Sequence, residues 1–440
     1  MLRISGSKIP SYLAEILRFE QLDRDSLQAL NEQRLSKLLM YAFNHVPYYR
    51  EVLGDCAVTD GTSARLDNFD QVPPLTKDIL RERFDSLQSD ESRQLGAYVN
   101  TSGGSTGEPV RFMQDRDYRD WNIANKMYYK TLGGQEIGDR ELRLWGSERD
   151  LLAGREKLSL RLKNWLYNRK ELNSFRMTPE AMREFVAAWN EHRPRWVEAY
   201  VQSIYEFGNF LKRHGLSVST PAGIVTTAGT LYPEMRQSIE STFGCRVYNR
   251  YGSREVGDVA CDCEQGRGLH LSVWNHYCEV LTKELGRCEA GALGKVHVTT
   301  LNNRAMPLIR YDIGDLAVRS AESRCVCGRN TPRIDRVEGR EMTVFRTRDG
   351  RIVPGEFFIH FLGVVFNKGF VGKFQVVQET YERIRIRIVI LDESRFRAET
   401  HAIEQSIRKT MGDDCEIVWE PVREIANSSS GKYMYTISEL

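Results

Sequence analysis

The sequence predicts a large α/β domain followed by a small α+β domain. Three observations predict this architecture. A strand–helix–strand unit spans residues 223–248, strands and one amphipathic helix occupy roughly the last hundred residues, and 440 residues exceed the roughly 100–200 of one ordinary domain. We expect the large domain over residues 1–338, with a helical part over about 1–90, and the small domain over residues 339–440.

The helical part is predicted from its spacing of leucines. Asp25 or Ser26 is expected to cap a helix whose leucines fall on overlapping faces. These leucines are Leu27, Leu30, Leu35, Leu38 and Leu39. The Pro73-Pro74 break then separates this region from another helix, expected around residues 77–84.

The strand–helix–strand unit has clear boundaries. Residues 223–227 form a short apolar run, which predicts a buried strand. Pro233 suits the first position of a helix, and Gly244 suits its end. Residues 245–248 then read as the next strand, so the unit predicts a βαβ connection in the large domain.

The small domain is predicted from two periodicities. Residues 383–388 alternate arginine and isoleucine, which predicts a strand with one buried and one cationic face. Residues 394–411 have the spacing of an amphipathic helix that ends at Gly412, and residues 415–419 predict a further strand. The loop over residues 339–351 is the expected boundary between the two domains.

Composition and charge exclude several classes of function. The chain has 62 Lys and Arg against 60 Asp and Glu, and a net charge of +2 gives no large attraction to nucleic acid or acidic membranes. No apolar run approaches the ~18 residues of a membrane span, and the N-terminal segment lacks the pattern of a signal peptide. Nine cysteines in a chain of this length do not form a disulfide framework. We therefore expect a cytoplasmic protein with neither a nucleic-acid partner nor a membrane span.

A glycine- and hydroxyl-rich segment over residues 101–109 is the strongest single feature. Its glycines allow backbone N–H groups to close around an anion, and its hydroxyl groups add donors, which is what a polyphosphate requires. It is not a Walker A loop, because the lysine of that motif is missing. The residues concerned are Ser102, Gly103, Gly104, Ser105, Thr106 and Gly107. The alternative is a plain surface loop.

Three further polar segments have ligand-binding chemistry. Glu255 follows a predicted buried strand and a glycine turn, where it could hold Mg²⁺ bound to phosphate oxygens. Asp315 could accept hydrogen bonds from two ribose hydroxyl groups. Lys432 lies on a polar Gly/Ser segment near the C-terminus. Taken alone, the glutamate and the lysine are better explained as solvated loop residues.

In this order along the chain, the segments resemble the motifs of the adenylate-forming superfamily, which includes acyl-CoA synthetases, adenylation domains and luciferases. Residues 102–109 are similar to its phosphate loop, 251–255 to Y-G-S-T-E, 311–315 to Y-R-T-G-D and 430–432 to the C-terminal S-G-K. Gly339-Arg340 is similar to the start of the hinge motif. Residues 46–50 and 74–81 match the N-terminal signature of the phenylacetate–CoA ligase-like and capsule-biosynthesis-like branch, so the resemblance covers nearly the whole chain.

The resemblance implies a fold and a reaction. The fold is a large domain with mixed sheets flanked by helices, followed by a small mobile α+β domain that rotates between two half-reactions. In the first half-reaction, a carboxylate attacks the α-phosphate of ATP and gives an acyl-adenylate and pyrophosphate. In the second, a thiol such as coenzyme A, or an amine, takes the acyl group.

The resemblance also assigns roles to residues. Lys432 and Glu255 would be catalytic, with the lysine bridging carboxylate and phosphate oxygens and the glutamate holding Mg²⁺. Asp315 and Arg340 would hold the ribose. The residues that would bind ATP are Ser102, Gly103, Gly104, Ser105, Thr106, Gly107, Tyr251, Gly252, Ser253, Glu255, Asp315 and Arg340.

The chain departs from the family motifs at several positions. Arg254 stands where the motif has Thr, and Asp312 where it has Arg. Glu341-Met342 replaces an acidic pair in the hinge motif, while residues 348–354 are similar to the capsule-type variant. Two alternatives therefore stay open: an amide-forming or carrier-loading ligase in polysaccharide or secondary-metabolite biosynthesis, and a non-catalytic, zinc-stabilised nucleotide-binding protein.

Cysteine and histidine spacing predicts a structural zinc site. Four soft ligands are available for a tetrahedral Zn²⁺ ion, and the branch named above has a similar pattern. They are Cys263, His270, Cys325 and Cys327, with Cys261 as a possible substitute. Four protein ligands leave no open position, so the site would not be catalytic. The alternative is a set of reduced thiols without metal.

The pocket for the acid is poorly specified by the sequence. The span where the family builds this pocket contains several aromatic residues, and for most of them we favour the interpretation as buried core residues. They are Trp145, Trp165, Tyr167, Trp196 and Tyr200. Arg169 and Arg176 are the cations that could meet a polar or acidic substrate. The sequence leaves the acid, the acceptor and the oligomeric state open, a homodimer included.

Overall fold

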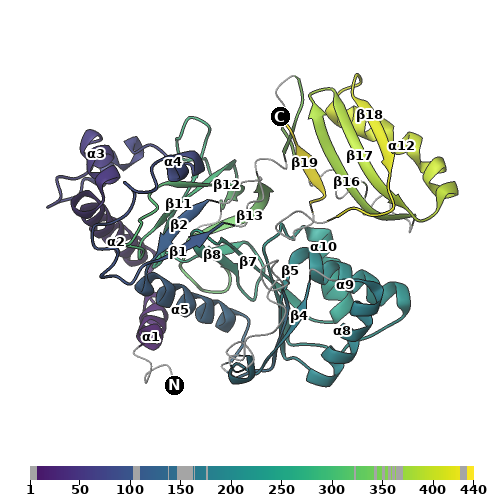
Figure 1. The fold of residues 1–440 in the computed structure, drawn as a ribbon, viewed down its shortest axis with the longest axis horizontal. Helices are drawn as coiled ribbons and strands as arrows, with labels where there is room; N and C mark the ends of the chain where they lie inside the picture. Colours follow the sequence, from purple (N-terminus) through teal and green to yellow (C-terminus); the bar gives the residue numbers. More distant parts are fainter. Residues whose placement is uncertain are drawn as a thin grey trace.

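The computed structural model shows a large body followed along the chain by a smaller one, which lies at the upper right of Figure 1. The structure describes residues 7–102, 110–136, 138–145, 162, 164–174, 177–321, 324–340, 344–348, 352–354, 358, 362, 370–426 and 434–440. The described strands form sheets of eleven and four strands and two two-stranded hairpins. The predicted fold class, a large α/β domain with mixed sheets and a small α+β domain, is confirmed.

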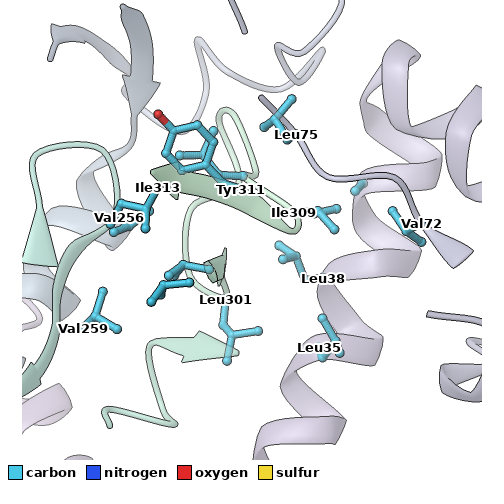
Figure 2. Close-up of a cluster of buried hydrophobic side chains, with 14 of the residues drawn as sticks. Leu35, Leu38, Val72, Leu75, Val256, Val259, Leu301, Ile309, Tyr311 and Ile313 are labelled. Carbon is cyan, nitrogen blue, oxygen red and sulfur yellow. The ribbon is translucent and has the colours of Figure 1, made fainter. Parts of the chain in front are cut away.

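The N-terminal part is helical, as predicted. Its elements are α1 (Ile9–Phe19), α2 (Arg24–His45), α3 (Pro47–Asp55), the 3₁₀ helix η1 (Leu66–Gln71) and α4 (Lys77–Glu82). The cap of α2 was predicted at the wrong residue: the carboxylate of Asp23 accepts the N–H of Ser26, because the helix begins at Arg24. Leu35 and Leu38 on the inner face of α2 are buried in the core shown in Figure 2.

The large sheet joins a parallel half to an antiparallel half. In the parallel half the strand order is β4-β3-β5-β6-β7, and helices α8, α9 and α10 bury one face of it around Trp189, Phe207 and Phe243. The elements are β3 (Glu141–Trp145), β4 (Arg169–Asn173), α8 (Pro179–His192), β5 (Trp196–Tyr200), α9 (Val201–His214), β6 (Gly223–Thr227), α10 (Pro233–Phe243) and β7 (Arg246–Ser253). The predicted βαβ unit is therefore confirmed as β6, α10 and β7.

The antiparallel half continues from β7 in the order β8-β9-β13-β12-β11-β10. Its strands are β8 (Gly257–Asp262), β9 (Leu269–Leu271), β10 (His276–Leu281), β11 (Leu293–Thr300), β12 (Tyr311–Arg319) and β13 (Arg333–Arg340). A separate hairpin of β1 (Tyr98–Thr101) and β2 (Arg111–Gln114) leads into α5 (Arg116–Leu132), whose N-terminal N–H groups are capped by Asp115. In the sequence, the glycine-rich segment lies between β1 and β2.

The smaller body contains a four-stranded sheet in the order β18-β17-β16-β19. Its elements are β16 (Val371–Thr380), β17 (Arg383–Ile390), α12 (Glu393–Met411), β18 (Glu416–Pro421) and β19 (Thr436–Ser438). Alternation on β17 is as predicted: Ile384, Ile386 and Ile388 are fully buried and contribute to a core with Phe396, Ile403, Ile407 and Met411 of α12. The arginines between the isoleucines form ion pairs with Glu379 and Glu420.

The next element along the chain is the hairpin of β14 (Val344–Arg346) and β15 (Ile352–Pro354), whose Phe345 and Val353 pack in the core of the smaller body. Strand β13 continues through Arg340, because Gly339 and Arg340 pair with Leu316 and Asp315 of β12. The predicted boundary after residue 338 thus falls inside this strand, and the division into domains stays a prediction. None of the helices in the described ranges is both long enough and apolar enough to span a bilayer.

Candidate functional site

The neck of the glycine-rich loop is closed by Ser102. Its backbone N–H donates to the carbonyl oxygen of Val110 over 2.8 Å, and its Oγ accepts the N–H of Val110 over 2.8 Å. These two bonds extend the β1–β2 pairing by one step and fix both ends of the loop. Gly103, Gly104, Ser105, Thr106 and Gly107 lie outside the described residues, so their binding of phosphate stays a prediction.

Glu255 sits in the tight turn between β7 and β8. Gly252 is required there, because a Cβ atom at this position would lie 2.1 Å from the carbonyl oxygen of Gly257. Gln114 Nε2 donates to the carbonyl oxygens of Arg254 (3.1 Å) and Glu255 (3.3 Å), and the Tyr118 hydroxyl also donates to that of Glu255 (3.3 Å). The turn is thereby fixed to β2 and α5, the two elements that follow the glycine loop.

The side chain of Glu255 fits a magnesium ligand. Only 6% of Glu255 is exposed, so the alternative of a solvated loop glutamate does not apply. In the described part of the chain no ion pair or side-chain hydrogen bond reaches its carboxylate. A buried carboxylate without a cation is costly, and Mg²⁺ with its phosphate ligands would compensate it.

Arg254 brings a cation to the loop neck. Its Nη1 donates to the carbonyl oxygen of Thr101 over 3.2 Å. This arginine is largely exposed and stands one residue before Glu255. A cation and a buried carboxylate therefore lie on one turn beside the glycine loop, which suits a complex of polyphosphate and Mg²⁺.

Asp315 is linked to the same turn from the other side. The hydroxyl group of Tyr251 donates to Asp315 Oδ2 over 2.9 Å, and Asp315 faces Arg340 in the register of β12 and β13. The pairing of Asp315 with Arg340 is what a shared ribose site needs, although the side chain of Arg340 is not described. Lys432 lies outside the described residues.

The segment from Asp70 to Leu75, called here the N-terminal strap, supports β12, the strand that carries Asp315. Leu75 pairs in parallel with Tyr311, with its N–H donating to the carbonyl oxygen of Arg310 over 3.1 Å. Arg310 is fully buried, forms an ion pair with Glu279 and donates to the carbonyl oxygens of Asp70 (2.8 Å) and Val72 (2.6 Å). Figure 2 shows Val72 and Leu75 near Ile309 and Tyr311 in this core.

Several residues near the site carry no motif that would have identified them. Gln114 and Tyr118 act through backbone carbonyl groups, and Arg310 acts through a strap more than 200 residues earlier in the chain. The sequence offers one indication that Gln114 and Tyr118 belong to the site, which is that they come shortly after the glycine loop. Such contacts depend on how distant segments of the chain pack together, which no local sequence pattern shows.

The four predicted zinc ligands come together. The thiol groups of Cys263, Cys325 and Cys327 and one imidazole nitrogen of His270 all lie within 4.8 Å of one another. His270 is on β9, Cys263 follows β8, and the two other cysteines precede β13, which pairs with β9. The spacing in sequence therefore corresponds to a real cluster in space.

The geometry of the cluster matches a tetrahedral zinc ion. The Sγ atoms of Cys263 and Cys325 are 3.7 Å apart, and Cys327 Sγ is 3.5 Å from His270 Nε2. A tetrahedron with usual Zn–S and Zn–N bond lengths has edges of about 3.8 and about 3.6 Å. His270 Nδ1 is 2.7 Å from the Thr331 hydroxyl. This contact orients the ring with Nε2 toward the thiols, as the hydrogen-bond partners of zinc-binding histidines do.

Cys261 is not part of this cluster. Its buried side chain packs in the core with Trp121 and Trp274 on the α5 side of β8. Burial raises the pKa of the Cys261 thiol well above its usual value, and it also raises the pKa of Cys263 to about 12, so the position of Cys261 and not its pKa separates it from the four ligands. Burial raises the pKa of Cys327 too, but hydrogen bonds from Arg329 and the neighbouring thiols outweigh it, and its net shift is downward.

The aromatic residues of the predicted acid pocket divide into three groups. Trp196 is in the core against Tyr248, and Trp165 and Tyr167 are exposed. The rings of Trp145 and Tyr200 are in contact at the carboxyl ends of β3 and β5, with centroids 4.3 Å apart and planes tilted by 34°. The chain runs outward from β3 to β4 and then returns to β5, so these two strands flank the switch point where open α/β sheets bind ligands.

The cations near this switch point are already paired. Arg169 forms an ion pair with Glu141 at 2.8 Å, and Arg143 and Arg250 both bind Glu198. Arg169 is therefore held by the protein, which weakens its predicted role toward an acidic substrate. Arg176 lies outside the described residues.

Comparison with known proteins finds similarity over nearly the whole chain. A family model described as the CapK C-terminal domain matches residues 345–439. Protein CapK of Staphylococcus aureus is 23% identical over 98% of this chain and 92% of its own length. A phenylacetate-coenzyme A ligase of Thermus thermophilus is 25% identical over 94% of this chain and 96% of its own length.

Among solved structures, 2-hydroxyisobutyryl-CoA ligase in its postadenylation state has a TM-score of 0.72, with 20% identity over 96% of this chain and 91% of that protein. In its thioesterification state the same ligase has a TM-score of 0.61, with 20% identity over 95% of this chain and 91% of that protein. The two parts of this chain are thus arranged more as in the first state. The chain is thus similar over nearly its whole length to Protein CapK and to a phenylacetate-coenzyme A ligase, and it has the fold of 2-hydroxyisobutyryl-CoA ligase.

Proposed function

We propose that the protein is an ATP-dependent, AMP-forming ligase that activates a carboxylic acid and passes the acyl group to a thiol such as coenzyme A. The observation that carries this proposal is the turn at Glu255, where a buried carboxylate, with no ion pair to any described residue, is fixed beside the neck of the glycine loop and linked through Tyr251 to Asp315. Similarity to phenylacetate–coenzyme A ligases along nearly the whole chain supports it.

The proposed first half-reaction joins two anions. An oxygen of the acid attacks the α-phosphorus of ATP, the bond to the bridging oxygen breaks, and pyrophosphate leaves. Lys432 would offset the repulsion by bridging the carboxylate and the α-phosphate, and the loop from Ser102 to Gly107 would hold the β- and γ-phosphates through backbone donors. Asp315 and Arg340 would hold the ribose, with Tyr251 orienting the aspartate. Mg²⁺ on Glu255 would neutralise phosphate charge.

In the proposed second half-reaction the acceptor attacks the acyl carbon and AMP leaves. A thiol is one acceptor, and an amine is the other. The amine is the alternative acceptor, because Glu341-Met342 replaces the acidic pair of the hinge motif. A rotation of the small domain after residue 338 is also part of the proposal. Strand β13 of the large sheet extends two residues beyond that point, to Arg340.

The Cys263, His270, Cys325 and Cys327 cluster is proposed to hold a structural zinc ion. It ties β9 to the loop before β13, and these two strands lie between β8 and β12 in the sheet. The ion would therefore stabilise the antiparallel half that carries Glu255 and Asp315, without taking part in the reaction.

A screen of carboxylic acids for pyrophosphate release, with coenzyme A, amino acids and amino sugars as acceptors, tests the proposed function. The expected result is acid-dependent release of pyrophosphate that Lys432→Ala and Glu255→Gln abolish. A non-catalytic nucleotide-binding protein would bind ATP, release no pyrophosphate with any acid, and respond to neither substitution.

A further inference from the structure

We propose that Tyr435 is a positioning residue, which holds the segment carrying Lys432 against helix α9 during the first half-reaction. This inference rests on the proposed function and concerns how the lysine reaches its place. Tyr435 is itself in the described part of the chain and makes contacts with both bodies.

On the side of the small body, Tyr435 is held firmly by β16. The N–H of Val376 donates to the carbonyl oxygen of Tyr435 over 2.7 Å, and Gln375 Nε2 donates to that of Met434 over 2.9 Å. The ring of Tyr435 lies 5.0 Å from that of Phe374, centroid to centroid. The backbone just before β19 is therefore part of the small sheet and moves with it.

On the other side, the hydroxyl group of Tyr435 reaches helix α9 of the large body. Gln202 Nε2 donates to it over 2.8 Å, and the hydroxyl group donates to Glu206 Oε1 over 3.5 Å. Gln202 also donates to Glu206 over 3.2 Å, so the three polar groups form one closed set across the two bodies. In Figure 1, the start of β19 lies close to α9 and α10.

An apolar contact surrounds these hydrogen bonds. The ring of Tyr435 packs against Val201, Tyr232 and Met235, which come from the starts of α9 and α10. Packing shields the hydrogen bonds from water, which strengthens them. A single tyrosine thus combines an apolar contact with two polar ones where the bodies meet.

The position of Tyr435 limits where Lys432 can be. The two residues are three apart, and three residues span at most about 11 Å when fully extended. Helix α9 begins directly after Tyr200, at the carboxyl end of β5 and beside the switch point where such sheets bind ligands. Fixing Tyr435 on α9 therefore keeps the lysine within reach of this region.

The arrangement of the two bodies indicates which half-reaction the contact serves. The chain superposes better on the postadenylation state than on the thioesterification state of the same ligase, as described above. Rotation of the small domain would break the contact of Tyr435 with α9. Loss of the hydroxyl group should therefore slow acyl-adenylate formation and leave transfer from a preformed acyl-adenylate unchanged.

Tyr435→Phe tests this inference, because it keeps the ring and removes the hydroxyl group. Tyr381→Phe is the matched control, since Tyr381 is an exposed tyrosine of the small body. With the acid found in the screen, we expect Tyr435→Phe to lower the kcat of acid-dependent ATP–pyrophosphate exchange about 3- to 10-fold, the effect of one hydrogen bond, with transfer from synthetic acyl-adenylate unaffected. Equal rates in Tyr435→Phe and Tyr381→Phe, or an equal loss in both half-reactions, would overturn it.

A second measurement does not depend on activity. Hydrogen exchange on the protein without ligands should show faster exchange at the start of α9 and at residues 434–438 in Tyr435→Phe than in Tyr381→Phe. Unchanged exchange at both segments would overturn the inference even if no acid were found. Absence of exchange activity in the wild-type protein, by contrast, would count against the proposed function alone.

Discussion

Tyr251 and Asp315 are joined by a hydrogen bond of 2.9 Å from the tyrosine hydroxyl to Oδ2, although their strands are not neighbours in the sheet. From β7 to β12 the order runs through β8, β9 and β13, which in a flat sheet would separate them by about 19 Å at ~4.8 Å per step. The sheet must therefore curl so that these two strands face each other. This curl brings two segments together that the chain separates by 64 residues.

Removing this bond should weaken nucleotide binding. In Tyr251→Phe, Asp315 loses an orienting donor, and a hydrogen bond to a charged group contributes about 1.5–3 kcal/mol. We expect ATP to bind about tenfold more weakly or worse, measured by titration calorimetry. Tyr277→Phe, which removes a hydroxyl group that accepts a hydrogen bond from Arg287 and belongs to none of the motifs, is the control and should bind ATP as the wild type does. Equal affinities in the two variants would contradict the role of Tyr251.

Gln114 is expected to affect the rate of pyrophosphate release, because it holds the turn that carries Glu255. Gln114→Leu keeps the size of the side chain but removes both hydrogen bonds to the turn, so the carboxylate of Glu255 loses its fixed place. We expect kcat for pyrophosphate release to fall about tenfold. Thermal unfolding of the same variant is the control. A normal kcat, or a loss of kcat that unfolding alone explains, would show that other contacts hold the turn.

Zinc content follows from the thiol cluster. The purified protein should contain about one zinc ion per chain, and Cys263→Ser should lose it, because three remaining ligands hold the ion weakly. The midpoint of thermal unfolding should then drop by several degrees, since binding energy at a structural zinc site is folding energy. Cys56→Ser, at a cysteine outside the cluster, should keep both metal and midpoint. Metal analysis that finds no zinc in correctly folded wild type refutes the site.

Stability should decline in mild acid because of His276. Burial lowers its pKa from 6.5 to about 4, while its ring nitrogens face the Val256 carbonyl oxygen (2.6 Å) and the Ser272 hydroxyl (2.8 Å) as a neutral imidazole. Between these two values the unfolded chain binds a proton that the folded protein does not. The stabilisation is therefore complete above pH 6.5 and is lost as the pH falls toward 4.

From pH 7 to pH 5 this single group should cost about 2 kcal/mol of unfolding free energy. Urea unfolding at the two pH values should show that loss in the wild type, and a loss smaller by about this amount in His276→Gln. His270 and His297, whose pKa values are also lowered, are present in both proteins and cancel in the comparison. Parallel pH profiles would show that His276 does not control the acid response.

Local patterns were predicted well because they depend on neighbours in the chain. The unit from Gly223 to Ser253 and the strand and helix from Arg383 to Met411 follow from alternation, helical spacing and glycine stops. The cap of α2 was missed because Asp23, Asp25 and Ser26 are all good capping residues, and only the helix start at Arg24 decides among them.

The sequence predicted which residues belong to the site but not how they are arranged in space. Nothing local shows that Glu255 is buried or that Gln114 holds its backbone, since both depend on the position of β2 beside the turn. The zinc ligands were found by spacing, yet their meeting depends on β9 pairing with β13, which places Arg333 opposite His270. Pairing partners this far apart in sequence are set by the packing of the whole sheet.

Isotope transfer tests the central claim, that a carboxylate of the substrate attacks the α-phosphate of ATP, most directly. The acid identified in the screen is labelled with ¹⁸O in its carboxylate and incubated with ATP and acceptor, and the products are analysed by mass spectrometry. The account predicts AMP carrying one ¹⁸O atom from the acid and unlabelled pyrophosphate. Formation of ADP, or AMP without the label, would contradict it.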